Sequence, residues 1–303
     1  MRAASYRRLP TEGHNPASRD IDTLDARGIL RVICREDARV PAAVRACSAD
    51  IARAVDAAVS CLRSGGRLIF VGAGTSGRLG VLEAAECPPT FGIPPGLVRA
   101  VMAGGRSAVF RSKEGAEDDA REGGRRLRAA ARRGDMVVGV AASGITPFVR
   151  GALASARRLG CRTTLVTSNA GVSAAPAQII ISPRVGPEVL SGSTRLKSGT
   201  AAKLVLNALT TAAMIRSGKA FGHWMVDLKP VSLKLKARAV RIVCDLGRVS
   251  PARASALLLR ARWDAKTAVL MARLGAGPAQ ARARLKASGG FLRNALGLPW
   301  GGC

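Results

Sequence analysis

The sequence of 303 residues has few aromatic side chains, only two histidines and no long apolar run. Aromatic residues make up 3% of it, which leaves few rings to stack on nucleic-acid bases. No run approaches the roughly 18 apolar residues that a membrane span needs. The first twenty residues lack the apolar block of a secretory signal. We therefore expect a cytoplasmic protein that works without a membrane.

Cysteines are few for a disulfide framework and are never spaced as CxxC. An odd, scattered set argues against disulfides and zinc sites and favours a reducing compartment. With only two histidines and no cluster of ligand residues, we expect no metal site. We interpret most of the cysteines as small core residues. The seven are Cys34, Cys47, Cys61, Cys87, Cys161, Cys244 and Cys303.

Acidic residues are scarce relative to basic ones, 20 against 48, which gives a net charge of +28. Such a chain could bind nucleic acid. However, many arginines lie in Ala/Arg-rich stretches at helical spacing, such as 121–133 and 253–262, and no zinc-finger or RNP-like motif is present. We interpret them as solvated helix faces. Specific nucleic-acid binding is not expected, although the positive field would attract an anionic substrate.

Strand and helix patterns alternate through the centre of the chain, which predicts an α/β fold with a parallel sheet. Short apolar runs predict five strands, at 67–72, 97–102, 135–141, 161–167 and 178–181. Helices are predicted from Gly74 to Pro88 and Pro89, from about Glu114 to Arg132, from near Pro147, and from about Leu196.

Beyond Pro230 the strand patterns end, and four short amphipathic helices are predicted. Their ranges are 233–244, 251–262, 265–274 and 278–286. We predict three parts: an N-terminal arm and helix (1–50), the α/β domain (51–229) and a small helical subdomain (230–303).

Three Ser/Thr/Gly-rich loops each precede a predicted helix. Helix N-termini offer unpaired N–H groups, and glycine lets an anion approach the backbone. In parallel sheets such loops gather at the carboxyl ends of the strands. The first loop lacks the GKS/T ending of a nucleotide P-loop, so a phosphorylated small molecule fits better. The candidate ligands are Gly74, Thr75 and Ser76, then Ser143, Gly144 and Thr146, then Ser191, Ser193 and Thr194.

Four longer segments resemble the bacterial N-acetylmuramic acid 6-phosphate etherases: 71–92 (VGAGTSGRLGVLEAAECPPTFG), 114–124 (EGAEDDAREGG), 142–149 (ASGITPFV) and 188–207 (EVLSGSTRLKSGTAAKLVLN). The resemblance runs in order from about residue 10 to residue 297. It implies a flavodoxin-like sugar isomerase (SIS) domain, with a five-stranded, mostly parallel sheet between helices. It also implies a homodimer and no cofactor.

The activity that the resemblance implies is that of a carbon–oxygen lyase in cell-wall recycling. It cleaves the D-lactyl ether of N-acetylmuramic acid 6-phosphate, giving N-acetylglucosamine 6-phosphate and D-lactate. By motif match the two catalytic glutamates are Glu86, in ECPPT, and Glu117, in EGAED. Elimination from an open-chain sugar needs one carboxylate to take a proton and one carboxylic acid to give one.

The two glutamates have different sequence settings. Glu86 is predicted at a helix end, where the dipole and partial burial would raise its pKa. Glu117 lies in an acidic run that we interpret mostly as first-turn residues of the following helix. Glu83 is interpreted as structural.

Several other residues are candidates for substrate contact. Lys197 or Arg195 is expected to pair with the phosphate or the lactyl carboxylate. Glu12 and Asn15 lie in the arm, and the resemblance leaves open a contact of this arm with the neighbouring subunit's site. Ile145 stands where some relatives carry an arginine, which removes a cation from the third-strand loop.

Three other functions share parts of this pattern. A non-catalytic sugar-phosphate sensor, like the distantly related glucokinase regulatory protein, would be expected to lose one glutamate. A transcriptional regulator would carry a helix-turn-helix ahead of the domain. A sugar-phosphate isomerase would lack the ECPPT and EGAED segments together.

Overall fold

The computed structural model describes residues 9–171 and 176–300, so Cys303 lies outside the described residues. The chain forms two compact units. The first holds the residues up to Ala84 together with Gly96–Thr210, and the second holds Ala85–Pro95 and the residues from Thr211 onward. The predicted domain boundaries at residues 50 and 229 stay predictions.

A five-stranded sheet with the order β2-β1-β3-β4-β5 lies at the centre of the first unit. All four strand pairs are parallel, which confirms the predicted fold class. The order is that of flavodoxin-like folds, which bind ligands at the carboxyl ends of their strands. The strands are β1 (Leu68–Gly72), β2 (Val98–Met102), β3 (Met136–Val140), β4 (Arg162–Val166) and β5 (Ile179–Ile181).

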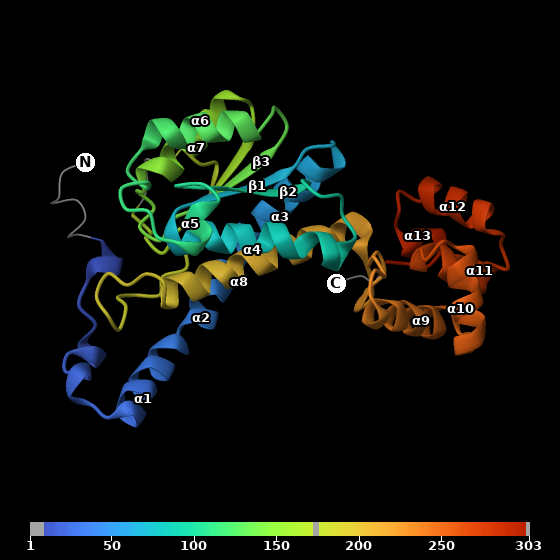
Figure 1. Ribbon diagram of the computed structural model, residues 1–303, viewed down its shortest axis with the longest axis horizontal. Coiled ribbons are helices and arrows are strands. Elements are labelled where there is room, and N and C mark those ends of the chain that lie inside the picture. Colours follow the sequence, from blue (N-terminus) through green and yellow to red (C-terminus); the bar gives the residue numbers. More distant parts are fainter. Residues whose placement is uncertain (1–8, 172–175, 301–303) are drawn as a thin grey trace. The chain divides into compact units, whose positions relative to one another are not determined.

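Helices cover both faces of this sheet, which explains why β1 and β3 are apolar along their whole length. Helices α6 (Ala120–Ala130) and α7 (Pro147–Arg158) lie together on one face (Figure 1). The residues of this layer form one buried cluster with Ile69 and Val137. On the other face are α3 (Ser48–Arg63) and α4 (Gly74–Phe91), whose Gly80 packs against Phe70.

The N-terminal segment has two helices where one is expected. Three short 3₁₀ turns, η2 (Pro10–Glu12), η3 (Pro16–Ser18) and η4 (Ile21–Thr23), lead into α1 (Ala26–Asp37) and α2 (Val40–Arg45). The segment is held to the rest of the unit by Asn15, whose side-chain N–H groups donate to Glu36 Oε2 (2.8 Å) and to the carbonyl of Pro187 (3.1 Å).

The prediction that α4 stops at Pro88 and Pro89 is wrong, because the helix continues through both to Phe91. Each proline removes one intrahelical hydrogen bond, but the buried side chain of Phe91 stabilises the last turn. The helix ends at Gly92, which has a φ of 62°. A Cβ atom there would lie 1.8 Å from the carbonyl oxygen of Asp227, so only glycine fits.

The predicted helix from Glu114 begins later than expected. Helix α6 starts at Ala120 because Asp119 caps it, accepting a hydrogen bond from the N–H of Glu122. The residues Glu114 to Asp118 form turns ahead of the helix. The interpretation of the acidic run as first-turn residues is therefore wrong for Glu114 and Asp118, and Glu122 is the acid in the first turn.

The second unit contains the four predicted C-terminal helices. Its buried core is built mainly from α9 to α11, with Val226 and Leu228. Three elements of this unit had no clear sequence pattern: the short π-helix η5, the β6–β7 hairpin that follows it, and the one-turn helix α13. The elements are η5 (Ile215–Lys219), β6 (Ala220–Phe221), β7 (Trp224–Met225), α9 (Leu233–Gly247), α10 (Pro251–Arg260), α11 (Ala265–Leu274), α12 (Pro278–Ala287) and α13 (Leu292–Ala295). The first unit also holds α5 (Ser107–Phe110) and most of α8 (Lys197–Met214).

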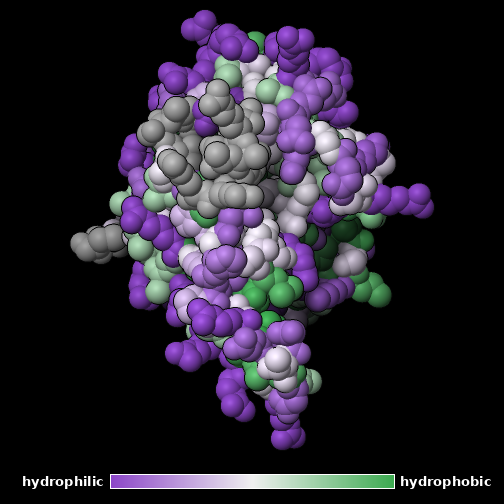
Figure 2. All heavy atoms as spheres, turned by 90° about the vertical axis from the view of Figure 1, so that its left-hand side faces the viewer, coloured by the Kyte–Doolittle hydropathy of each residue, from purple (hydrophilic) through white to green (hydrophobic). Residues whose placement is uncertain are grey.

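The sequence predicts a charged, solvated surface and cysteines that lie mostly in the core. Figure 2 shows a face covered mostly by hydrophilic side chains. None of the six cysteines within the described residues forms a disulfide, and four of them are buried. Burial raises the pKa of Cys61 and of Cys161 to about 11, which makes both thiols poor nucleophiles. Within the described ranges, no helix combines the length and apolar character that crossing a bilayer requires.

Candidate active site

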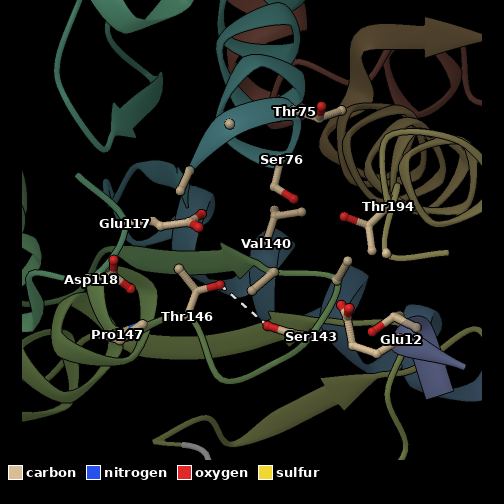
Figure 3. Close-up of a pocket in the computed structure, with 16 residues that line it drawn as sticks. Glu12, Thr75, Ser76, Glu117, Asp118, Val140, Ser143, Thr146, Pro147 and Thr194 are labelled. Atoms are coloured by element: carbon tan, nitrogen blue, oxygen red, sulfur yellow. Dashed lines mark hydrogen bonds between the residues drawn. The ribbon is translucent and has the colours of Figure 1, made fainter. Parts of the chain in front are cut away.

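A cavity of about 240 Å³ lies at the carboxyl edge of the sheet (Figure 3). Residues that follow β1 and β3 form its floor, and loops from three other parts of the first unit close around it. Its lining residues are Thr11, Glu12, Ala73, Gly74, Thr75, Ser76, Glu117, Asp118, Val140, Ala141, Ala142, Ser143, Thr146, Pro147, Gly192 and Thr194.

Five hydroxyl side chains surround this cavity: Thr75, Ser76, Ser143, Thr146 and Thr194 (Figure 3). The hydroxyls of Ser143 and Thr146 lie 3.5 Å apart, within hydrogen-bond reach of each other. Each of the three predicted loops therefore contributes hydroxyl groups to one cavity. Hydroxyls both donate and accept, which suits a ligand that carries phosphate and sugar oxygens.

The three helix N-termini near the cavity differ in what they still offer. The first turn of α4 lines the cavity, and the first N–H groups of a helix have no intrahelical partner. At α7, Pro147 has no N–H, and the N–H of Phe148 donates to the carbonyl of Glu117 (2.9 Å). At α8, the carboxylate of Glu188 already accepts the first two N–H groups. We therefore expect α4 to provide most of the backbone contacts to an anion.

Glu117 lies on the cavity wall beside Asp118, opposite Glu12 (Figure 3). Its backbone is fixed, because its carbonyl accepts the N–H of Phe148 at the start of α7. The Glu117 side chain points toward the cavity (Figure 3). Its partial burial, together with the charges of Asp118 and Glu114, raises the pKa of Glu117. A raised pKa brings a carboxyl group closer to the working pH of an acid/base catalyst.

Close packing of α6 on α7 holds the loop that carries Glu117. A Cβ atom on Gly123 would lie 2.0 Å from the carbonyl oxygen of Phe148, and one on Gly151 would lie 1.9 Å from that of Ala120. Glycine at these two positions lets the helices approach so closely. Larger residues would separate them and displace the loop between α5 and α6.

The arm contributes Thr11 and Glu12 to the cavity of its own chain. Whether the arm also reaches the neighbouring subunit's site stays a prediction. The hydroxyl of Thr11 is buried and has no hydrogen-bond partner among the described residues. A buried hydroxyl of this kind on a cavity wall can bond to a ligand. Asn15, the other arm candidate, is instead used to hold the arm in place.

The charges of the cavity are unusual for an anion site. Three lining residues are acidic, Glu12, Glu117 and Asp118, and none of the described lining residues is Lys or Arg. Ile145 lies beside the cavity residues Ser143 and Thr146, where an arginine would have supplied a cation, and its N–H donates to the Ser143 hydroxyl (3.3 Å). A ligand anion here depends on hydroxyls and the α4 N-terminus.

Comparisons with known proteins give the family. A family model for the N-terminal SIS domain of glucokinase regulatory protein matches residues 50–157. The N-acetylmuramic acid 6-phosphate etherase of Cronobacter sakazakii is 50% identical over 290 residues, which is 95% of this chain and 98% of the relative. The etherase of Yersinia pestis is 50% identical over the same shares. This chain belongs to the N-acetylmuramic acid 6-phosphate etherase family.

Solved structures agree with the fold of this etherase family member. A phosphoheptose isomerase from Francisella tularensis matches 63% of this chain and 100% of its own, with a TM-score of 0.51. Sequence identity is 17%, so the match concerns the fold alone.

Most of the predicted substrate residues of this etherase family member lie around the one cavity. Gly74, Thr75, Ser76, Ser143, Thr146, Thr194 and Glu117 all line it. Gly144, Ser191 and Ser193 do not line it, although they belong to the same loops. Sequence reasoning left out Gly192 as a ligand and noted Glu12 only as a residue of the arm. It had no reason to single out Thr11.

Lys197 is placed differently from its predicted role. Its side chain is 1% exposed, and its Nζ lies 2.5 Å from Glu36 Oε2. It is absent from the described lining of the cavity. The ion pair gives Lys197 a structural use, tying α8 to α1. Arg195, the other candidate, is exposed.

Glu86 belongs to the second unit, whereas the cavity is formed wholly by residues of the first. Glu86 is exposed, so the partial burial expected there is not found. Glu83 is 5% exposed, and its carboxylate accepts hydrogen bonds from Thr210 (2.7 Å) and Lys203 (3.3 Å) of α8. This is a structural use of Glu83, as expected.

Proposed function

We propose that this chain cleaves the D-lactyl ether of N-acetylmuramic acid 6-phosphate, giving N-acetylglucosamine 6-phosphate and D-lactate. The observation that carries the proposal is the 50% identity to etherases over 95% of the chain and 98% of the relatives. The cavity supports it, because it combines hydroxyls and a helix N-terminus with a carboxyl group of raised pKa.

The chemistry follows from the weakness of an ether oxygen as a leaving group. In the open-chain sugar the carbon 2 proton is acidic, because it lies next to the aldehyde. A carboxylate takes this proton, the bond between carbon 3 and the lactyl oxygen breaks, and a carboxylic acid protonates the departing D-lactate. Water then adds across the carbon 2–carbon 3 double bond, with hydroxyl on carbon 3 and a proton returned to carbon 2.

The residues of the cavity suggest how the substrate is held. The phosphate would lie at the first turn of α4, with Gly74, Thr75 and Ser76, because these provide N–H groups and hydroxyls. Ser143, Thr146 and Thr194 would bind the remaining phosphate and sugar oxygens. Glu12 and Thr11 would accept or share hydrogen bonds with sugar hydroxyls on the opposite side from Glu117.

Glu117 would be one of the two acid/base groups. Its raised pKa allows it to take a proton and to return one within the same cycle. Glu86 would be the other, as its place in the ECPPT segment implies, and its exposed carboxyl group is accessible.

The direct test is incubation of the purified protein with N-acetylmuramic acid 6-phosphate, followed by an assay for D-lactate. Release of D-lactate and N-acetylglucosamine 6-phosphate in equal amounts is the expected result. Binding of the sugar phosphate by calorimetry without lactate release would instead establish a non-catalytic sensor, the alternative suggested by the match to glucokinase regulatory protein.

We also propose that the etherase acts as a homodimer, and a mixing experiment addresses which subunit supplies each glutamate. Glu86→Gln and Glu117→Gln variants are unfolded together and refolded as mixed dimers. Random pairing makes about half of the dimers mixed. If each site takes its two glutamates from different subunits, each mixed dimer has one site with both glutamates intact. Activity then returns to about one quarter of the native level. If one subunit supplies both glutamates, no activity returns.

A further inference from the structure

A second cavity of about 220 Å³ adjoins the first. The two share Ala73, Gly74 and Glu117 as lining residues, so Glu117 lies on the wall between them. The second cavity lies toward β2 and α5, and its remaining wall includes Arg78, Met102 and Lys113. The proposed substrate has further groups beyond its phosphate, and these need space near the acid/base group. The second cavity offers such space beside Glu117.

Arg78 is held in place by the backbone of α5. Its Nε donates to the carbonyl of Val109 (2.7 Å) and its Nη2 to the carbonyl of Ala108 (2.9 Å). These two bonds fix the plane of the guanidinium group and leave further N–H donors unused. An arginine already fixed in this way loses little conformational freedom when it binds a planar carboxylate.

Two basic residues, Arg78 and Lys113, line the second cavity together with acidic residues. Within the described residues, neither Arg78 nor Lys113 forms an ion pair with a carboxylate. Glu114 is the one other acidic residue of the second cavity besides Glu117. The first cavity differs, because it has three carboxylates and neither Lys nor Arg among its described lining residues, whereas the second also has two cations. The two cavities therefore suit different groups of one ligand.

We propose that the second cavity binds the lactyl carboxylate of the substrate, with Arg78 as its main ligand and Lys113 as a supporting charge. This inference rests on the proposed etherase function. The substrate carries a phosphate on carbon 6 and a carboxylate on the ether substituent at carbon 3, on either side of the reacting carbons. With the phosphate at α4 in the first cavity, the carboxylate enters the second, and Glu117 faces the bonds between them.

The assignment explains how the site distinguishes substrate from product. N-acetylglucosamine 6-phosphate has the phosphate but no carboxylate, so it fills the first cavity alone. D-lactate has the carboxylate alone. Arg78 therefore sets specificity for the lactyl group and holds the leaving group in place.

The experiment compares the Arg78→Met variant with the native enzyme on ligands that differ in the carboxylate. We expect kcat/KM for N-acetylmuramic acid 6-phosphate to fall about 10- to 100-fold, the usual effect of losing a charge-assisted bond. Competitive inhibition by N-acetylglucosamine 6-phosphate should stay within about twofold of native, since no carboxylate is involved. Inhibition by added D-lactate should weaken strongly.

Two further variants separate this role from a general loss of charge or fold. Arg111→Met removes a positive charge from the same segment but not from the cavity wall, and it should behave like native enzyme. Lys113→Met removes a side chain that forms no ion pair within the described ranges, and it should weaken D-lactate inhibition without affecting the fold. Equal weakening of all three ligands in Arg78→Met, or unchanged D-lactate inhibition in both cavity variants, would overturn the proposal.

Failure of the etherase function and failure of the carboxylate site give different results. If the native chain releases no lactate, the etherase assignment fails on its own. Calorimetry with the two sugar phosphates then still measures the second cavity. The proposal requires tighter native binding of the carboxylate-bearing sugar, and loss of that advantage in Arg78→Met.

Discussion

The two edges of the five-stranded sheet place carboxyl groups in opposite environments. Asp135 precedes β3 at the amino edge and is fully buried. Its oxygens accept hydrogen bonds from the backbone and guanidinium of Arg67 and from the N–H of Arg132, at 2.7 to 2.9 Å. Glu117 lies at the carboxyl edge, and none of the described residues donates a hydrogen bond to its carboxylate.

The pKa shifts of these two groups go in opposite directions. Burial alone would raise the pKa of Asp135, but the bonds from Arg67 and Arg132 outweigh it and lower the value. At Glu117 partial burial and the neighbouring acids act together and raise the pKa. One carboxyl group is fully satisfied and stabilises the fold, whereas the other keeps its bonding capacity for a substrate. The predictions below test this division.

The largest effect is expected for Glu117→Gln. The amide side chain cannot act as a general acid or base, so the rate of D-lactate release should fall about 10²- to 10⁴-fold. The thermal unfolding curve should stay close to native, because no hydrogen bond of the fold depends on this side chain. A rate within a few-fold of native would remove Glu117 from the acid/base step.

Asp135→Ala should have the opposite result. It leaves the partly buried guanidinium of Arg67 without its carboxylate, which should cost about 3–5 kcal/mol of unfolding free energy. Denaturant unfolding measures this loss. At a temperature where the variant is folded, kcat should match native enzyme, and a large fall in kcat would contradict the division between the two edges.

Lys197→Met tests whether Lys197 is structural or a phosphate ligand. Loss of the pair with Glu36 should destabilise the protein by about 2–3 kcal/mol, since Asn15 still donates to the same carboxylate. We expect the KM for substrate to remain within about twofold of native, because the pair lies away from the cavity. The double variant with Glu36→Gln should recover part of the stability. A large rise in KM with native stability would restore the phosphate role.

Acid should weaken the fold through the carboxyl groups that have lowered pKa values. Burial opposes ionisation of both Asp135 and Glu36. Hydrogen bonds from Arg67 nevertheless lower the pKa of Asp135 below its usual 3.8. Hydrogen bonds from Lys197 and Asn15 lower the pKa of Glu36 below its usual 4.5. Their stabilisation is complete above about pH 4.5 and is lost as the pH falls through the folded pKa values. The unfolding free energy, measured at several pH values across this range, should fall less steeply with acid in Asp135→Ala than in the native protein. An equally steep fall in the variant would contradict the assignment.

The smallest effect is expected for Ile145→Arg, which restores a cation beside Ser143 and Thr146. An exposed charge pair is worth about 1 kcal/mol or less, so KM should fall by at most about fivefold. The gain should shrink at high salt. Tighter binding of inorganic phosphate in the variant would place the phosphate near this loop, and unchanged binding would place it elsewhere.

Sequence patterns predicted the sheet well because apolar strands and Gly-rich loops are local features. All five strands lie within one or two residues of their predicted ranges. The end of α4 was not predictable in the same way. Pro88 and Pro89 favour a stop, but the burial of Phe91 and the contact of Gly92 with Asp227 depend on residues more than a hundred positions away.

The sequence by itself determined the fold class, the family and the three hydroxyl loops, since each depends on residue types in a short order. Only the tertiary structure decided which side chains remain available. Glu188 closes the N-terminus of α8, Glu36 takes Lys197, and the arm brings Thr11 and Glu12 to the cavity. Such pairings join residues far apart in the chain, and burial then fixes whether a charge is satisfied or free to act.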